Sequence, residues 1–311
     1  MARTIFMGSP EFAVPSLEAH VTSHDVVGVV TQPDRPAGRG GTLRRPPVKV
    51  AAQAHGLPVF QPPTLRSPEA LAQLRAWEPT LIVVAAFGQI LTHDVLELPP
   101  YGCLNVHPSL LPRWRGPAPV PAAIMAGDEI TGVTIMKLDP GVDTGPILSQ
   151  REEPVRPTDT AATLLTRLSH AGAELLVETI PPYLAGELAP RPQPQTGVTY
   201  SQELEKEDGR LDWNQSAIVL DRQIRAVTPW PGAFTTWKGR RLKVLAATPL
   251  PDHETEGLPG TVVTVGRGAG VVTGRGVLQL LEVQRAGKRA LPIRDFLNGY
   301  QDFVGSRLGE G

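Results

Sequence analysis

The sequence predicts an α/β chain: a Rossmann-like, mostly parallel sheet with helices on both faces, followed by a small antiparallel β-barrel of the OB-like kind. The chain opens with a strand, a helix and a second strand, at Thr4–Met7, Phe12–His20 and Val26–Val30, and this order predicts a parallel sheet. The unbroken apolar run Leu81–Ala85 is typical of a parallel strand that is buried on both faces. Beyond about residue 205, short strand-like runs alternate with Gly-rich turns, which favours a small barrel or sandwich.

Each remaining element follows from apolar periodicity and from Pro or Gly at its ends. In the first part of the chain we expect helices at Val50–His55, Glu69–Trp77, Leu91–Leu98, Pro117–Met125 and Thr160–Ile180, and strands at Pro58–Phe60, Leu104–His107, Gly132–Lys137 and Ile147–Glu153. In the last part we expect strands at Ala233–Trp237, Arg241–Ala247, Gly260–Val265, Gly270–Thr273 and Gly276–Val283.

The length and composition are those of an ordinary globular chain with room for two domains. The chain has 311 residues, of which 41% are hydrophobic and 20% charged, so we expect packed cores and little disorder. Residues 184–200 are rich in Pro and Gln and lack periodicity, as linkers do. We therefore expect a catalytic domain over residues 1–188, a linker over 189–204 and a barrel domain over 205–311.

Charge and cysteine content restrict the partners and the compartment. The formal net charge is -1, so a polyanionic partner must be bound by a local basic patch. Cys103 is the single cysteine, which rules out an internal disulfide scaffold and suits a reducing compartment. We find neither a signal peptide nor an apolar run of membrane-spanning length. We expect a cytoplasmic protein, without a membrane partner, that is a monomer.

Polar residues at the end of one predicted strand form the first candidate site. Asn105 and His107 are two residues apart, so their side chains leave the same face of an extended segment. Pro108 ends the strand pattern. A second loop, Leu138–Gly145, supplies Asp143. The ends of strands in an open α/β sheet are common places for a ligand site.

If these three side chains converge, they suit direct acyl transfer between two bound substrates. Asn105 would donate a hydrogen bond to the oxyanion of a tetrahedral intermediate. His107 would add a donor or move a proton, and Asp143 would orient His107 and accept a proton through it or through a water. The stretch offers no well-placed nucleophile, and one His, one Asp and one Asn are a poor zinc set, so we predict no metal. The alternative is that these side chains only satisfy loop backbone groups and cap a turn.

The segment Thr31–Lys49 is basic and lacks periodicity. Its glycines favour mobility and its prolines oppose a helix; its charged residues are Arg35, Arg39, Arg44, Arg45 and Lys49 against the single acid Asp34. Such a loop is either a solvated basic surface or an arm that binds phosphates. Gly8-Ser9-Pro10 lacks the Gly pattern of a dinucleotide site and reads as a tight turn.

The last part of the chain has a small basic surplus. From Lys206 to Gly311 there are fifteen Lys and Arg against eleven Asp and Glu. A five-stranded barrel with this charge is compatible with nucleic-acid binding. A purely structural module fits equally well.

The site motif resembles a known family. Asn105-Val106-His107-Pro108-Ser109-Leu110-Leu111-Pro112, with Asp143 downstream, resembles the signature of 10-formyltetrahydrofolate-dependent formyltransferases. Within that family, further stretches are similar to the members that act on methionyl-tRNA: Gln32–Gly40, Arg113–Gly116, Gly132–Met136 and Arg225–Gly232. The resemblance runs from Ile5 to about Asn298. Pro108 departs from it, because many of those members have Gly there.

The resemblance implies a reaction, a co-substrate and roles for individual residues. The formyl group of 10-formyltetrahydrofolate would pass to the α-amine of initiator methionyl-tRNA, and the protein would bind the acceptor stem. Asn105, His107 and Asp143 fall on the catalytic trio. The resemblance places folate binding at Ser109, Leu110, Leu111, Pro112, Phe87, Gly88 and Asp139. It places tRNA binding on the basic loop, at Arg35, Arg39, Arg44 and Arg45.

Three other functions remain open. A formyltransferase for a small amine would share the trio, but it needs neither the arginine arm nor a barrel domain. A catalytically dead tRNA-binding protein would not need an intact trio. A folate hydrolase would transfer the formyl group to water.

Overall fold

A computed structural model describes residues 2–37, 42–253 and 255–310. The chain forms two compact units. The sheet unit consists of Met1–Pro119, Ile130–Pro154 and Leu165–Ser201, and the C-terminal unit consists of Val120–Glu129, Val155–Leu164 and Gln202–Gly311. Two short segments of the first half of the chain therefore belong to the C-terminal unit, which a division by sequence position alone does not anticipate.

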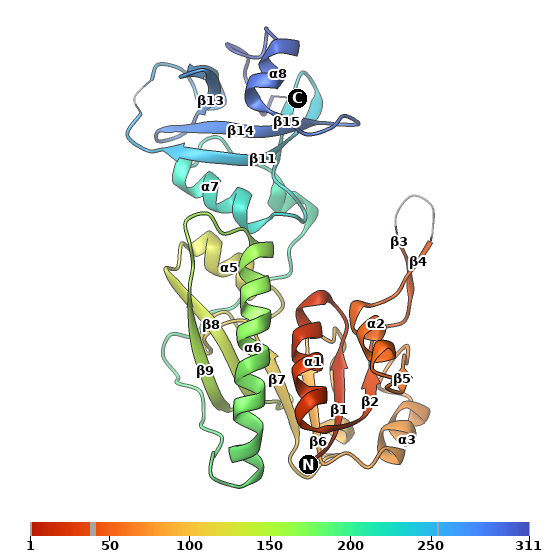
Figure 1. Ribbon diagram of the computed structural model, residues 1–311. Helices are drawn as coiled ribbons and strands as arrows, with labels where there is room; N and C mark the ends of the chain where they lie inside the picture. The colour runs from red at the N-terminus through yellow and green to blue at the C-terminus, as the bar shows by residue number, and fades with distance from the viewer. Residues whose placement is uncertain (1, 38–41, 254, 311) are drawn as a thin grey trace. The chain divides into compact units, whose positions relative to one another are not determined.

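Seven strands form the main sheet of the sheet unit, in the order β5-β2-β1-β6-β7-β8-β9 (Figure 1). They are β1 (Arg3–Gly8), β2 (Asp25–Val30), β5 (Val59–Phe60), β6 (Leu81–Ala85), β7 (Cys103–His107), β8 (Ile130–Lys137) and β9 (Ile147–Pro154). The pairs from β5 to β7 are parallel, whereas β8 and β9 add antiparallel pairs. The predicted Rossmann-like, mostly parallel sheet is confirmed. From β1 the chain first adds β2 and β5 on one side and then returns to add β6 and β7 on the other. Ligands of open α/β sheets bind beyond the strand ends at such a reversal of strand order.

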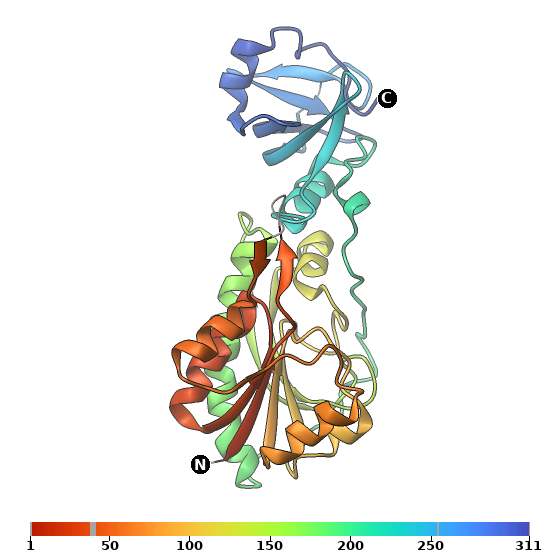
Figure 2. The same ribbon diagram turned by 90° about the vertical axis from the view of Figure 1, so that its right-hand side faces the viewer.

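Helices cover both faces of this sheet (Figure 2). Those of the sheet unit are the 3₁₀ turn η1 (Glu11–Ala13), α1 (Val14–Ser23), α2 (Pro47–Ala54), α3 (Pro68–Ala76), α4 (His93–Leu96) and most of α6 (Ala161–Leu184). Leu74 of α3 and Val95 of α4 share one buried cluster with Ile82 of β6. On the other face, His20 of α1 bonds Thr4 of β1, Nε2 to Oγ1, at 2.9 Å.

The basic segment contains regular structure that the sequence did not predict. β3 (Arg35–Ala37) and β4 (Thr42–Arg44) form a two-stranded antiparallel hairpin, and α2 begins at Pro47. The prediction of an irregular loop from Thr31 to Lys49 was therefore wrong at Arg35–Ala37, at Thr42–Arg44 and from Pro47 onwards. At the base of the hairpin, Lys49 Nζ lies 2.8 Å from Asp34 Oδ2, and Gln61 Nε2 donates to Asp34 Oδ1 at 2.9 Å. Lys49 thus anchors the hairpin and is not part of its free basic surface.

The C-terminal unit contains a curled antiparallel sheet with the order β10-β11-β14-β13-β12 and with β15 paired to β14 (Figure 2). Its strands are β10 (Phe234–Trp237), β11 (Arg240–Leu250), β12 (Val262–Val265), β13 (Gly268–Val272), β14 (Val277–Arg285) and β15 (Leu291–Pro292). Its helical segments are α5 (Pro119–Ala126, all but its first residue), the first turn of α6, η2 (Lys206–Gly209), α7 (Ala217–Ala226) and α8 (Ile293–Gly299). This is the predicted OB-like architecture, but the sheet has six strands where five were expected.

Aromatic rings fill the core of the C-terminal unit. The ring centroid of Trp237 lies 5.8 Å from that of Phe296 and 5.2 Å from that of Phe303. The indole Nε1 of Trp237 donates to Ser306 Oγ at 3.0 Å, so its one polar atom is satisfied while the ring is buried.

No helix in the described parts of the chain is both long and apolar enough to cross a membrane.

The glycine in β2 gives a test of the packing between the sheet and α3. A Cβ at Gly28 would lie 2.5 Å from the ring of Trp77, which follows α3. We expect Gly28→Ala to lower the free energy of unfolding by about 1–3 kcal/mol, because the indole must move. Urea unfolding followed by tryptophan fluorescence measures the change. Gly299→Ala is the control, since no atom lies within 4 Å of its added Cβ; equal unfolding midpoints for the two variants would contradict the packing described here.

Candidate active site

Asn105 and His107 lie at the carboxyl end of β7 and point to the same face of the sheet, as predicted. Val84 of β6 is the register partner of Asn105 and of Met7 in β1, and paired residues in a sheet point the same way. Both polar side chains therefore lie on the face that α3 and α4 cover. In the sheet, only β6 lies between β7 and β1, where the strand order reverses.

The imidazole of His107 is buried between two oxygen acceptors. Its side chain is 5% exposed. Nε2 lies 3.1 Å from the carbonyl oxygen of Trp114, and Nδ1 lies 3.7 Å from Asp143 Oδ1. Because a carbonyl oxygen only accepts, we assign the proton of the neutral ring to Nε2. The unprotonated Nδ1 then faces the carboxylate.

Burial is the main influence on the pKa of His107. Desolvation lowers this pKa below its usual value of 6.5, and the Asp143 carboxylate and the Trp114 carbonyl act in the opposite direction. The ring is therefore neutral at pH 7, and the carboxylate beside Nδ1 favours any proton that arrives there. This is the arrangement of a group that accepts a proton during a reaction.

Two left-handed residues hold the acceptors on either side of His107. Trp114 has φ +60° and Asp143 has φ +52°, a region that non-glycine residues rarely adopt. Between them in space, the backbone N–H of Gly116 donates to Asp143 Oδ2 at 2.8 Å. Gly116 has φ +108°, and a Cβ there would lie 2.6 Å from the Ser201 carbonyl oxygen. Only glycine fits this position.

The amide of Asn105 is half-buried and makes no hydrogen bond with any residue that the structure describes. His107 and Asp143 do bond to loop backbone groups, as the alternative interpretation of the sequence expected. Asn105 does not, so its amide N–H groups remain available at the end of β7. An available donor beside a proton acceptor is compatible with stabilising an oxyanion.

The loop after β7 is fastened to the two antiparallel strands. Ser109 Oγ donates to the Arg113 carbonyl at 2.6 Å, and Leu111 N donates to Thr134 Oγ1 at 3.1 Å. Ser109 and Leu111 are buried, whereas Leu110 and Pro112 are half-buried. Of the four positions in this loop that were predicted to bind folate, Leu110 and Pro112 therefore offer accessible side-chain surface.

The other residues predicted for folate lie in two loops. Phe87 is 2% exposed and packs in the sheet core; its carbonyl accepts from Ser9 Oγ and Gln32 Nε2 at 3.3 and 3.2 Å. Gly88 is exposed and has φ +80°. Asp139 Oδ1 accepts from Gly141 N at 3.1 Å and Thr144 Oγ1 at 2.7 Å, so its carboxylate shapes the loop that carries Asp143.

Ser9 explains the turn after β1. Besides its bond to Phe87, its hydroxyl accepts from Thr31 Oγ1 at 3.3 Å and from Gln32 N at 3.1 Å. The turn Gly8-Ser9-Pro10 thus joins the ends of β1, β2 and β6 through side-chain bonds within the protein.

The predicted tRNA-binding arginines that the structure describes lie on the hairpin. Arg35 and Arg44 are exposed register partners on β3 and β4, and Arg45 follows them, also exposed. Arg39 lies outside the described residues. Two like charges directly opposite each other destabilise a hairpin, and an anion bound between them would relieve this repulsion.

The residues that the structure describes offer neither an ionised thiol nor a cluster of metal-ligating side chains. Cys103 is buried, and burial raises the pKa of its thiol to about 12, so the thiol stays protonated at neutral pH. Within residues 2–37, 42–253 and 255–310, no group of three or more His, Cys, Asp and Glu could hold a metal ion.

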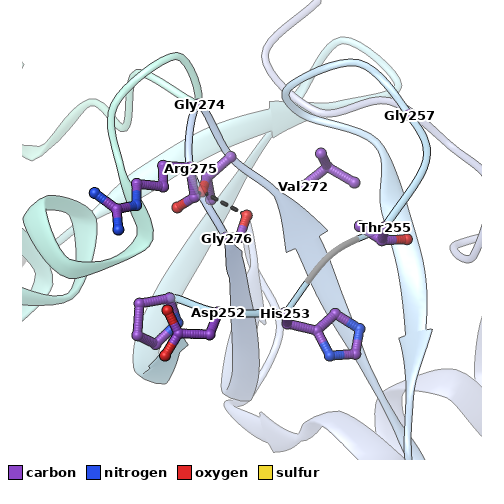
Figure 3. Close-up of a pocket in the computed structure, with 10 residues that line it drawn as sticks. Asp252, His253, Thr255, Gly257, Val272, Gly274, Arg275 and Gly276 are labelled. Atoms are coloured by element: carbon purple, nitrogen blue, oxygen red, sulfur yellow. Dashed lines mark hydrogen bonds between the residues drawn. The ribbon is translucent and has the colours of Figure 1, made fainter.

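A cavity of about 450 Å³ in the C-terminal unit is lined by Pro251, Asp252, His253, Thr255, Gly257 and residues 272–276 (Figure 3). The side chain of Arg275 points away from His253 and Thr255 in this view. Thr273 Oγ1 already donates to the carbonyls of Arg275 and Gly276. The cavity therefore lacks the convergent polar side chains of the β7 site.

Comparison with known proteins identifies the family of the chain. The formyl transferase model matches residues 3–180, and the formyl transferase C-terminal domain model matches residues 203–301. Methionyl-tRNA formyltransferase of Chloroflexus aurantiacus is 51% identical over 314 residues, covering 99% of this chain and 100% of that protein. Methionyl-tRNA formyltransferase of Myxococcus xanthus is 49% identical, covering 98% and 97%.

The chain belongs to the methionyl-tRNA formyltransferase family.

A solved structure supports the fold of this family member. HypX from Aquifex aeolicus in complex with tetrahydrofolic acid matches with a TM-score of 0.65 and 20% identity, over 97% of this chain and 48% of that one. At this identity the likeness concerns the fold alone.

Sequence reasoning missed the backbone groups that complete the site of this formyltransferase. The Trp114 carbonyl and the Gly116 amide contact His107 and Asp143, yet a backbone group has no signature of its own. The one signal was Gly116 itself, in a stretch that the resemblance had already singled out.

The burial of His107 predicts its titration. We expect its pKa, measured from the imidazole C2–H resonance by NMR, to lie below 6.5 and to fall further in Asp143→Asn, because the carboxylate raises it in the native chain. Asp94→Asn, an exposed carboxylate in α4, is the control and should leave the pKa unchanged. A rise of the pKa in Asp143→Asn would contradict the pairing.

Proposed function

We propose that this chain transfers the formyl group of 10-formyltetrahydrofolate to the α-amine of initiator methionyl-tRNA, giving formylmethionyl-tRNA for translation initiation. The observation that carries the proposal is the buried His107 beside Asp143. Asn105, two residues earlier on the same face of β7, has a side-chain amide that, among the residues that the structure describes, is free to donate. Relatives named methionyl-tRNA formyltransferase match nearly the whole chain at about half identity. Together they support both the chemistry and the choice of acceptor.

The first step forms the new carbon–nitrogen bond and gives a tetrahedral intermediate. The neutral α-amine attacks the formyl carbon, and the carbonyl electron pair moves to its oxygen. Asn105 donates a hydrogen bond to this oxyanion, and removal of one such donor typically costs ~10²–10³ in rate. A protein donor serves well here because the end of β7 is fixed in the sheet and needs no reorganisation.

The second step moves one proton and breaks one bond. The attacking amine loses its proton to the His107–Asp143 pair, directly or through a water. The imidazolium then donates from Nε2 to Trp114 O and from Nδ1 towards Asp143. The electron pair of the oxyanion re-forms the carbonyl as the bond between the formyl carbon and N10 breaks, N10 takes the proton from the imidazolium, directly or through a water, and tetrahydrofolate leaves. The cationic ring exists only during the reaction, which agrees with a site that keeps it neutral at rest.

The co-substrate would lie along the loops that flank the trio. We assign this role to Ser109, Leu110, Leu111, Pro112, Phe87, Gly88 and Asp139. Leu110, Pro112 and Gly88 are the accessible members and would contact the ring system. The buried members would hold the loops in place.

The acceptor stem would be bound by the hairpin and the C-terminal unit. The cross-strand pair Arg35 and Arg44 can bind a backbone phosphate, with Arg45 and Arg39 beside it. A-form grooves are hard to read, so selection of the initiator would depend on an unpaired acceptor end. We also propose that the protein is cytoplasmic and acts as a monomer.

The catalytic proposal predicts a graded loss of rate. With 10-formyltetrahydrofolate and methionyl initiator tRNA, we expect Asn105→Ala to lower kcat by ~10²–10³ and His107→Ala to lower it by ~10²–10⁴. Asn298→Ala, an exposed amide in α8, is the control. Thermal unfolding checks that each variant is folded. Native rates in folded Asn105→Ala would contradict the oxyanion role.

Product analysis separates the rival functions. Formate production without charged tRNA indicates a hydrolase, and turnover only with a small amine indicates a sister formyltransferase. Tight tRNA binding that is not followed by any formyl transfer indicates a binding protein.

The hairpin proposal predicts a change in salt dependence. We expect Arg35→Ala or Arg44→Ala to weaken tRNA binding and to reduce the slope of log K against log salt by ~1, one phosphate contact each. Titration of binding between low and moderate salt measures the slope. Arg66→Ala, an exposed arginine elsewhere in the same unit, should leave it unchanged; an equal loss at Arg66 would mean that general charge, and not the hairpin, binds the tRNA.

A further inference from the structure

The segment that the sequence predicted to be a linker contacts the active site. Residues up to Ser201 belong to the sheet unit, and the backbone of Arg191 pairs with Ile147 at the start of β9. From there to Ser201 the segment meets both loops that flank His107. It contributes three side chains, those of Gln193, Thr199 and Ser201, to hydrogen bonds with those loops.

Gln193 fixes the loop that carries Asp143. Its side chain is buried, with the residue 6% exposed. Nε2 donates to the carbonyls of Asp143 and Gly145, both at 2.8 Å, so both amide protons are used. Oε1 accepts from Arg115 Nε at 3.0 Å and from Arg115 Nη2 at 2.8 Å. One buried amide therefore joins the Asp143 loop to the loop after β7.

Thr199 fixes the loop that carries Trp114. Its Oγ1 accepts from Trp114 N at 2.8 Å, its carbonyl accepts from Arg115 N at 3.0 Å, and its own N–H donates to Pro112 O at 3.3 Å. Ser201 continues the contact, because its N–H donates to Arg115 O at 2.7 Å. The loop is held by a short run of parallel backbone bonds and by the hydroxyls of Thr199 and Ser201, the latter donating to Arg115 O and accepting from Ala118 N, both at 3.1 Å.

Gln193 and Thr199 act on the two left-handed residues of the site. Gln193 donates to the backbone carbonyl of Asp143, the residue whose side-chain carboxylate faces Nδ1 of His107. Thr199 holds the N–H of Trp114, whose carbonyl faces Nε2. Left-handed conformations of non-glycine residues persist only where the surroundings determine them strongly. Without these two side chains, the backbones of Asp143 and Trp114 each lose a direct hydrogen bond that helps to fix their conformation.

We propose that Gln193 and Thr199 are positioning residues for formyl transfer, which hold Asp143 and Trp114 in the conformations that place their oxygens on the two ring nitrogens of His107. The proposal rests on the function proposed above. Neither side chain touches a reacting atom in this assignment. The segment from Gln193 to Thr199 thus forms the outer layer of the active site as well as leading into the C-terminal unit.

Matched variants within the same segment test the proposal kinetically. Gln193→Glu keeps an acceptor for Arg115 but removes both donors, and Thr199→Val keeps the shape but removes the acceptor for Trp114 N. We expect each to lower kcat by ~10², the cost of misplacing a catalytic group by about 1 Å, with KM for either substrate changed far less. Thr199→Ser restores the hydroxyl and should recover kcat.

The controls are the same substitutions at exposed neighbours. Gln195→Glu and Thr196→Val lie in the same segment and are exposed. They should retain the native kcat. If Gln193→Glu and Thr199→Val also retain it while folded, or lose no more than these controls, the proposal is wrong.

A thermodynamic cycle tests the positioning without using activity. In the native chain, Asp143→Asn should shift the NMR-measured pKa of His107, and in Gln193→Glu the same substitution should shift it by much less, because the carboxylate has already left its place. The charge added by Gln193→Glu is present in both halves of that comparison and cancels. An equal shift in both backgrounds would overturn the role of Gln193.

The two measurements separate this proposal from the function on which it rests. A native chain that transfers no formyl group would refute the proposed function, and the cycle would still report whether Gln193 positions Asp143. If the chain transfers formyl groups normally but Asp143→Asn shifts the pKa of His107 equally in both backgrounds, only the positioning role of Gln193 is refuted.

Discussion

The candidate active site depends on one buried imidazole that lies between a carbonyl and a carboxylate. A neutral histidine can donate through only one nitrogen, so the resting ring satisfies the Trp114 carbonyl and leaves Nδ1 facing Asp143. Burial keeps the ring neutral, and the carboxylate stabilises it once it is protonated. A group of this kind is stable at rest and ready to accept a proton. The loops around β7 are arranged to maintain these two contacts.

The change from parallel to antiparallel pairing at β7 makes this arrangement possible. On one side, β6 fixes the register of Asn105; on the other, β8 places Thr134 opposite His107. Thr134 Oγ1 donates to the Ser109 carbonyl at 2.7 Å and accepts from Leu111 N. The loop after β7 is therefore bonded to the strand beside it, and its backbone can return to His107 at Trp114.

The basic hairpin is held by the same kind of polar contacts. Asp34 is bonded by Lys49 and Gln61, and Gln32 Nε2 donates to the Phe87 carbonyl at the end of β6. The arginines are thus carried on a short hairpin with a fixed base. The exposed arginines of this hairpin give it a local basic surface although the net charge of the chain is only -1.

The sequence by itself determined the order of the elements, the parallel sheet, the OB-like unit, and the placement of Asn105 and His107 on one face, because strand periodicity and Pro or Gly boundaries are local properties. It did not determine the hairpin within residues 35–44, the inclusion of residues 120–129 and 155–164 in the C-terminal unit, or the contact of Gln193 with Asp143. These depend on residues far apart in the chain: Gln193 is 50 positions from Asp143. A Pro-rich stretch with no periodicity reads as a linker from local pattern alone. Only the tertiary structure shows that its buried amide bonds the loop that carries Asp143 to the loop after β7.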